Sequence, residues 1–235
     1  MVSLACSLRT GSRLQAVVFD MDGVIVDSHP AHRFAWRQFL RTFGKEVTDK
    51  ELDFIMDGRK RKDIFFHFLG PLTDEQLQEY GNLKNEFFWQ AAPDALPVPG
   101  AFEFIECIRQ AGITMAVATS ASANRTRETL QRLGLSKHFT AVVTGDDVRE
   151  GKPDPGIYRL ACQRINRPAE TAVAVEDSAS GIRAAKDAGL KCVGIAGYQS
   201  GDKLTAAGAD YVLRDFLNLS LREFQSLVGM QPQPS

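Results

Sequence analysis

Residues 16–25 read AVVFDMDGVI, in which an apolar run leads directly into two acidic residues and a glycine. The run has the composition of a buried β-strand, and a buried strand that ends in unpaired charge is unfavourable. A divalent cation that gathers the carboxylates of Asp20 and Asp22 removes this conflict, and oxygen ligands suit a hard ion such as magnesium. The stretch therefore predicts an active site at the end of a strand.

The length and composition are those of a globular protein that can bury a full core. The chain has 235 residues, 44% of them hydrophobic, and a formal net charge of -1 from 28 basic and 29 acidic residues. Because these charges are interspersed, the molecule has no overall field that would attract nucleic acid or an anionic membrane. Neither is an expected partner.

The sequence also favours a cytoplasmic location. No apolar run approaches the roughly 20 residues that span a bilayer, and residues 1–13 lack the continuous apolar segment of a secretory signal. The cysteines lie far apart, without the close spacing of a zinc site, and are typical of free thiols in a reducing compartment. They are Cys6, Cys107, Cys162 and Cys192.

Apolar runs with strand character alternate with helical patterns along most of the chain. The expected strands are residues 16–19, 113–118, 141–144, 171–175, 192–195 and, more weakly, 211–213. The expected helices between and after them are residues 124–133, 155–165, 181–188 and a last one from about Ser220. This order is typical of an α/β fold, a Rossmann-like three-layer core with a parallel sheet. Ligands of such sheets bind at the carboxyl ends of the strands.

The interval from about residue 30 to residue 95 breaks this alternation, because it consists of consecutive helical patterns. The expected helices are residues 31–43, 49–56, 61–69 and 74–90. Thr73 and Gln76 have the spacing of a capping box at the start of the last one. Breaker-rich flanks on both sides could act as hinges, so the interval has the character of an inserted helical lid.

Polar side chains follow three further expected strands. They are Thr119 and Ser120, then Lys152, then Glu176 and Asp177. Because the carboxyl ends of parallel strands meet at one edge of a sheet, we expect these side chains to converge with Asp20 and Asp22. Two pairs of acids, a hydroxyl and an ammonium suit a cation together with a phosphoryl group.

With these residues in this order, the sequence resembles the haloacid dehalogenase superfamily. The resemblance is carried by Asp20-x-Asp22-Gly-Val, Thr119, Lys152 and the pair Glu176–Asp177, and it spans nearly the whole chain. The helical insertion directly after the first motif is similar to the small α-helical cap of the phosphatase and beta-phosphoglucomutase branch. The resemblance implies an HAD-like core of residues 1–28 and 97–235 and an all-α cap domain of residues 29–96.

The resemblance also implies a role for each core residue. Asp20 would attack phosphorus and form an aspartyl phosphate, while Asp22 would act as general acid and base, a role that needs a raised pKa. Thr119 would donate a hydrogen bond to a phosphoryl oxygen, and Lys152 would oppose repulsion between the nucleophile and its anionic target. The implied Mg²⁺ ligands are Asp20, Asp22 through its main-chain carbonyl, Asp177 and Glu176.

Six residues are candidates for substrate binding, and three of them have a structural alternative. His32 and Trp36 share one face of an expected helix, where core packing is the alternative for Trp36. Arg61 could face the solvent, and Asn124 could simply cap a helix. The candidates are Ser120, Asn124, His32, Trp36, Arg61 and Lys84.

We therefore expect a Mg²⁺-dependent phosphatase that hydrolyses a small phosphorylated metabolite, with a sugar phosphate favoured, as a monomer or small homo-oligomer. The alternative is a phosphomutase similar to beta-phosphoglucomutase, which His32, Arg61 and the pair Lys84–Asn85 favour. Lys60 argues against the mutase, because a small residue usually precedes that arginine. A catalytically silent protein that binds a phosphorylated ligand is a third possibility, against which the complete set of acids argues.

Overall fold

The computed structural model describes residues 13–92 and 96–230. Its core is a six-stranded sheet in which every neighbouring pair is parallel, in the order β3-β2-β1-β4-β5-β6. The strands are β1 (Ala16–Phe19), β2 (Thr114–Ala118), β3 (Ala141–Val143), β4 (Ala172–Glu176), β5 (Lys191–Ile195) and β6 (Tyr211–Leu213). The predicted α/β class is confirmed.

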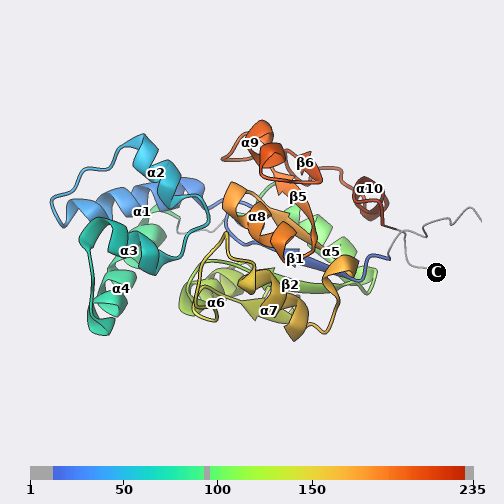
Figure 1. Cartoon of the computed structure of the whole chain (residues 1–235), viewed down its shortest axis with the longest axis horizontal. Helices are drawn as coiled ribbons and strands as arrows, with labels where there is room; N and C mark the ends of the chain where they lie inside the picture. The colour runs from blue at the N-terminus through green and yellow to red at the C-terminus, as the bar shows by residue number, and fades with distance from the viewer. Residues whose placement is uncertain (1–12, 93–95, 231–235) are drawn as a thin grey trace, which may run out of the picture.

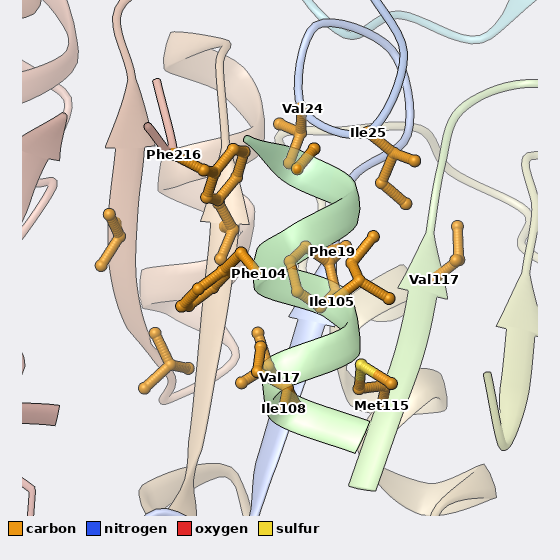
Figure 2. Close-up of a cluster of buried hydrophobic side chains, with 14 of the residues drawn as sticks. Val17, Phe19, Val24, Ile25, Phe104, Ile105, Ile108, Met115, Val117 and Phe216 are labelled. Atoms are coloured by element: carbon orange, nitrogen blue, oxygen red, sulfur yellow. The ribbon is translucent and has the colours of Figure 1, made fainter. Parts of the chain in front are cut away.

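Large and small side chains alternate along the central strands and separate the two faces of the sheet. Val17 and Phe19 of β1 point into one buried cluster, where they meet α5 (Ala101–Gln110), as Figure 2 shows. Ala16 and Val18 point into the other cluster. The helices α6 (Ala123–Arg132) and α10 (Leu221–Leu227) contribute to the first cluster, and α7 (Gly156–Arg164), α8 (Ala179–Asp187) and α9 (Gly201–Ala206) contribute to the second.

The expected elements of the core agree with the structure to within one or two residues at their ends, but two helices had no counterpart in the sequence analysis. They are α5 and α9. Helix α5 begins after Gly100, whose φ is +77° and where a Cβ would meet the backbone of Phe216 at 2.5 Å. Its buried residues Phe104, Ile105 and Ile108 have helical spacing, so the apolar signal was present between the flanking breakers.

Four helices follow β1 and form a group of their own beside the sheet (Figure 1). They are α1 (His29–Arg41), α2 (Asp49–Ile55), α3 (Arg61–Leu69) and α4 (Asp74–Ala91). Capping boxes begin α2 at Thr48 and α4 at Thr73, and the second of them has the predicted Gln76 partner. An aromatic cluster that includes Trp36, Phe39 and Phe65 fills the space between these helices.

The loop between α2 and α3 contacts the core at the carboxyl ends of the strands. Ser120 Oγ donates to the carbonyl of Gly58 at 2.5 Å, and Gln199 Nε2 donates to Asp57 Oδ1 at 3.0 Å. Lys60 Nζ donates to the carbonyl of Val148 at 2.6 Å. These contacts hold the helical group against the carboxyl ends of the strands. The division of the chain into a core of residues 1–28 and 97–235 and a cap of residues 29–96 stays a prediction.

The remaining expectations about the chain concern its thiols and its helices. Cys107, Cys162 and Cys192 are free, and Cys6 lies outside the described residues. None of the helices in residues 13–92 and 96–230 combines the length and the apolarity needed to cross a bilayer.

We predict that Phe39→Ala destabilises the protein because Phe39 is fully buried among Trp36, Phe65 and Tyr80. Loss of the ring should lower the free energy of unfolding by about 3 to 5 kcal/mol, measured by urea denaturation. Phe66→Ala is the matched control, since Phe66 is 38% exposed, and it should cost less than about 1 kcal/mol. Equal losses in the two variants would contradict this account of the helical core.

Candidate active site

The polar residues predicted to converge do lie together at the carboxyl ends of the strands. Asp20, Thr119 and Asp177 each follow a strand directly, from β1, β2 and β4, and each is buried. The register explains this, because Phe19 of β1 is paired with both Val117 of β2 and Val175 of β4. Lys152 reaches the same place from the loop after β3.

Lys152 joins two carboxylates that different strands deliver. Its ammonium donates to Asp20 Oδ1 at 2.7 Å, to Glu176 Oε1 at 2.5 Å and to the carbonyl of Ala118 at 3.1 Å. Burial alone would lower the pKa of Lys152, but the charges of Asp20 and Glu176 outweigh it and raise the pKa. The side chain is therefore a fixed positive charge in contact with the predicted nucleophile.

Glu176 is fully occupied by hydrogen-bond donors. Besides Lys152, its Oε1 accepts from the hydroxyl of Tyr158 at 3.0 Å, and its Oε2 accepts from two backbone N–H groups and from Ser178 Oγ at 2.9 Å. A Cβ on Gly181 would overlap this carboxylate, so α8 can approach only with a glycine here. This geometry gives Glu176 a positioning role toward Lys152, and its predicted role as a metal ligand stays a prediction.

Asp20 and Asp177 have the chemistry of ligands for a hard cation. Burial and the neighbouring carboxylates raise the pKa of Asp20 in spite of Lys152, and burial raises the pKa of Asp177 in spite of His29, whose Nε2 lies 2.5 Å from Asp177 Oδ2. Two buried carboxylates whose charge is not fully balanced suit a divalent cation with oxygen ligands.

A complete side-chain cage for a metal is not formed. In the described part of the chain, no group of three His, Cys, Asp or Glu side chains is arranged around a common point. The main-chain carbonyl of Asp22 stays a predicted ligand beside the carboxylates. Gly23, with a φ of +75°, lets the chain turn here, since a Cβ would overlap the carboxylate of Asp177.

The direction of the pKa shift of Asp22 differs from the expectation. Arg125 donates to the carboxylate through both terminal nitrogens of the guanidinium, Nη1 to Oδ1 at 2.9 Å and Nη2 to Oδ2. Ser28 Oγ donates to Oδ1 at 2.7 Å, and His32 Nε2 lies 3.3 Å from the same oxygen. Burial would raise the pKa of Asp22, but Arg125 and His32 hold it well below its usual range. The predicted rise in pKa is wrong for this arrangement, because the guanidinium of Arg125 and the ring of His32 outweigh the effect of burial.

Arg125 is one of the site residues that the sequence did not predict, together with Ser28 and His29. Asn124 is exposed on α6 and does not line the cavity, because the helix turns its neighbour Arg125 inward instead. This places Arg125 on the buried face of α6 with Thr129 and Leu130. The helical spacing of Arg125 with Thr129 and Leu130 was the available signal.

The other five candidates for substrate binding do line one cavity between the helical group and the strand ends. They are Ser120, His32, Trp36, Arg61 and Lys84. Trp36 packs in the aromatic cluster and also borders the cavity, so core packing and substrate binding do not exclude each other for this residue. Lys84 Nζ lies 2.8 Å from His32 Nδ1, and burial lowers the pKa of both groups, that of His32 to about 3.

The comparison with known proteins agrees with this site. Residues 14–189 match the model of the haloacid dehalogenase-like hydrolases, and the chain belongs to that family. The phosphorylated carbohydrates phosphatase of Thermotoga maritima is 34% identical over 190 residues, which cover 76% of this chain and 83% of that protein. The validoxylamine A 7'-phosphate phosphatase of Streptomyces hygroscopicus subsp. limoneus is 33% identical over 208 residues, with coverages of 86% and 93%.

More distant relatives extend the range of activities. The beta-phosphoglucomutase of Bacillus subtilis is 28% identical over 217 residues, covering 88% of this chain and 92% of that protein. Among solved structures, a mutant of CbbY from Rhodobacter sphaeroides in complex with xylulose-(1,5)bisphosphate is similar, with a TM-score of 0.79 and 30% identity. The match covers 89% of this chain and 98% of that one. The chain is thus an enzyme of the phosphatase or phosphomutase type.

We predict that His32 makes the stability of the protein depend on pH. Its pKa is about 3 in the folded state, against a reference value of 6.5, so between these values the unfolded chain binds the extra proton. Lowering the pH from about 7.5 to 5.5 should therefore reduce the free energy of unfolding, by about 1.4 kcal/mol more in the wild type than in His32→Gln.

The difference between the two proteins isolates His32, because His29, whose pKa shifts upward, titrates in both. His67→Gln is the control, since that ring is exposed, and its stability should follow the wild-type pH dependence. Parallel pH curves for the wild type and His32→Gln, measured by urea denaturation, would refute the assignment.

Proposed function

We propose that the chain is a Mg²⁺-dependent phosphatase that hydrolyses a small phosphorylated metabolite, with a sugar phosphate as the favoured class, through an aspartyl phosphate on Asp20. One observation carries the proposal: Asp20, held by Lys152 at 2.7 Å, borders the cavity that the helical group covers. The relative named as a phosphorylated carbohydrates phosphatase supports the substrate class. A cytosolic location and a monomeric or small homo-oligomeric state are part of the proposal.

In the proposed mechanism, an oxygen of Asp20 attacks phosphorus while the bond from phosphorus to the leaving oxygen breaks and that oxygen takes a proton from Asp22. Water then attacks the phosphorus of the aspartyl phosphate and gives its proton to Asp22, which releases inorganic phosphate and restores the Asp20 carboxylate. Lys152 stabilises the negative charge beside the nucleophile throughout, and Thr119 donates a hydrogen bond to the phosphoryl group.

Asp20, Asp177 and the carbonyl of Asp22 would hold Mg²⁺, which supplies positive charge to the phosphoryl oxygens when it is bound. The helical group, residues 29–96 in the predicted division, would act as the cap that keeps bulk water from the reacting atoms. Its contacts through Asp57, Gly58 and Lys60 are the ones that must open for exchange of substrate and product.

A phosphomutase is the second candidate, because Lys84 and His32 form a contact of 2.8 Å at the cavity and a beta-phosphoglucomutase is among the relatives. The argument against it from Lys60 is weaker than the sequence suggests. That side chain points to the carbonyl of Val148 and does not border the cavity, so it puts no charge against a sugar.

A panel of phosphorylated sugars and other metabolites would test both candidates. Release of inorganic phosphate and formation of a positional isomer are followed in the same reactions, with and without a glucose phosphorylated at two positions as activator. Phosphate release without isomer formation supports the phosphatase. Isomer formation that depends on the activator would replace it with the mutase.

We predict that Asp20→Asn lowers the rate of phosphate release by about 10⁴-fold or more, because the amide cannot attack phosphorus. Asp187→Asn is the control, since that aspartate is exposed on α8, and it should keep the wild-type rate. Chelation of divalent cations should also suppress the wild-type reaction, and added Mg²⁺ should restore it. Wild-type turnover in a folded Asp20→Asn variant would rule out the mechanism.

A further inference from the structure

His29 is a buried polar side chain that has no role in the proposed mechanism. It is the first residue of α1, and its Nε2 lies 2.5 Å from Oδ2 of Asp177, a carboxylate that follows β4. Because an ionised carboxylate only accepts hydrogen bonds, Nε2 is the atom that carries the proton. Of the residues that the structure describes, no other donates to the Asp177 carboxylate. The direction of this predicted metal ligand therefore depends on one imidazole.

The pair of His29 and Asp177 lies directly against the first motif. A Cβ on Gly23 would overlap both His29 Nε2 and Asp177 Oδ2, so the backbone of Gly23 packs on the hydrogen bond between them. The carbonyl of Asp22, another predicted ligand, belongs to the same peptide unit as the Gly23 N–H. Asp20, Asp177 and His29 also border the same cavity. The hydrogen bond thus lies beside the groups that would hold the cation.

The hydrogen bond from His29 occupies only one oxygen of Asp177. Oδ2 accepts from the imidazole, whereas Oδ1 has no hydrogen bond from any residue in the ranges 13–92 and 96–230. A donor at one oxygen fixes the plane of the carboxylate and leaves the other oxygen for a cation. Mg²⁺ in particular demands near-ideal octahedral geometry, so a ligand that is held in a fixed direction favours its binding.

Tyr198 keeps the ring of His29 in place. The two rings stack, with centroids 4.7 Å apart and planes inclined by 15°. The other ring nitrogen, Nδ1, is buried and has no hydrogen-bond partner in the described part of the chain, so no polar contact fixes that edge of the ring. Stacking on Tyr198 is therefore the contact that directs Nε2 towards Asp177.

The helical group in turn holds Tyr198, which lies in the loop after β5. The tyrosine hydroxyl donates to Asp53 Oδ1 at 2.6 Å and accepts from Arg33 Nη1 at 2.8 Å. Arg33 belongs to α1 and Asp53 to α2. The orientation of His29 thus depends on contacts between the helical group and the core.

We propose that His29 is a positioning residue for the metal: its Nε2–H holds Asp177 Oδ2 and leaves Oδ1 for Mg²⁺, while Tyr198 keeps the imidazole in place. The inference rests on the proposed function, whose metal site it deepens. Hydrogen bonds of this kind to a metal-ligating side chain typically change metal affinity by about 10- to 100-fold. Because His29 begins α1, the helical group contributes to metal binding although it supplies no ligand.

Calorimetric titration of Mg²⁺ into the protein without substrate tests the inference independently of turnover. His29→Ala should weaken Mg²⁺ binding about tenfold or more, because Asp177 loses its donor. His29→Gln should stay within about threefold of the wild type, because its amide Nε2 can donate to the same oxygen. His67→Ala is the matched control, since that ring is exposed, and it should bind Mg²⁺ as the wild type does.

Urea denaturation shows whether each variant is folded, and rescue by His29→Gln separates the hydrogen bond from a loss of packing. Equal affinities of the wild type and His29→Ala, or equal losses in His29→Ala and His29→Gln, would overturn the inference. If the wild type itself binds no Mg²⁺, the metal dependence in the proposed function fails. Mg²⁺ binding that His29→Ala leaves unchanged overturns the positioning role alone.

Tyr198→Ala tests the stacking contact in the same titration. Loss of the ring should weaken Mg²⁺ binding about threefold or more, because His29 is then free to turn away from Asp177. Tyr211→Ala is the control, since Tyr211 is 42% exposed on β6, and it should keep the wild-type affinity. Equal affinities in the two tyrosine variants would overturn the role of Tyr198.

Discussion

The ion pairs of Lys152 are the interaction on which the rest of the site depends. One buried ammonium stabilises carboxylates at the ends of two neighbouring strands, 2.7 Å from Asp20 and 2.5 Å from Glu176. Removing one partner of a buried pair costs about 3 to 5 kcal/mol, because the remaining charge is left unbalanced. The positive charge that we propose for the attack on a phosphoryl group therefore also holds these two strand ends together.

The two faces of the sheet contribute to this arrangement in different ways. Large side chains fill the α5 face, where the ring centroids of Phe19 and Phe139 lie 6.2 Å apart. Small side chains such as Ala174 on the other face let α7 and α8 come close. This close approach brings Tyr158 and the first turn of α8 to Glu176, which in turn holds Lys152. Packing on one face thus sets the electrostatics at the strand ends.

Side chains of the cap also contribute to the site. Helix α1 delivers His32, α4 delivers Lys84, and the core helix α6 delivers Arg125, so Asp22 lies where the two parts of the molecule meet. Its carboxylate contacts His32 of the helical group and Arg125 of the core. The residue that we propose as general acid and base is therefore held by side chains of both the cap and the core.

The sequence by itself determined the class of fold, the order of the motif residues and the edge of the sheet where they meet. Each of Asp20, Thr119 and Asp177 follows a strand directly, and parallel strands all end on one edge, so no knowledge of side-chain directions was needed. The capping box at Thr73 and the aromatic helical group were also visible, because their signals are local.

Only the tertiary structure decided which of these charges are partners. The pair of Asp22 and Arg125 joins residues 103 positions apart, and that of Lys152 and Glu176 joins residues 24 positions apart. Such pairs depend on helix orientation and on the direction of each side chain, which periodicity does not give. For this reason the direction of the pKa shift of Asp22 and the exposure of Asn124 both differ from expectation. The identity of a residue fixed its chemistry, whereas its partner was fixed by packing.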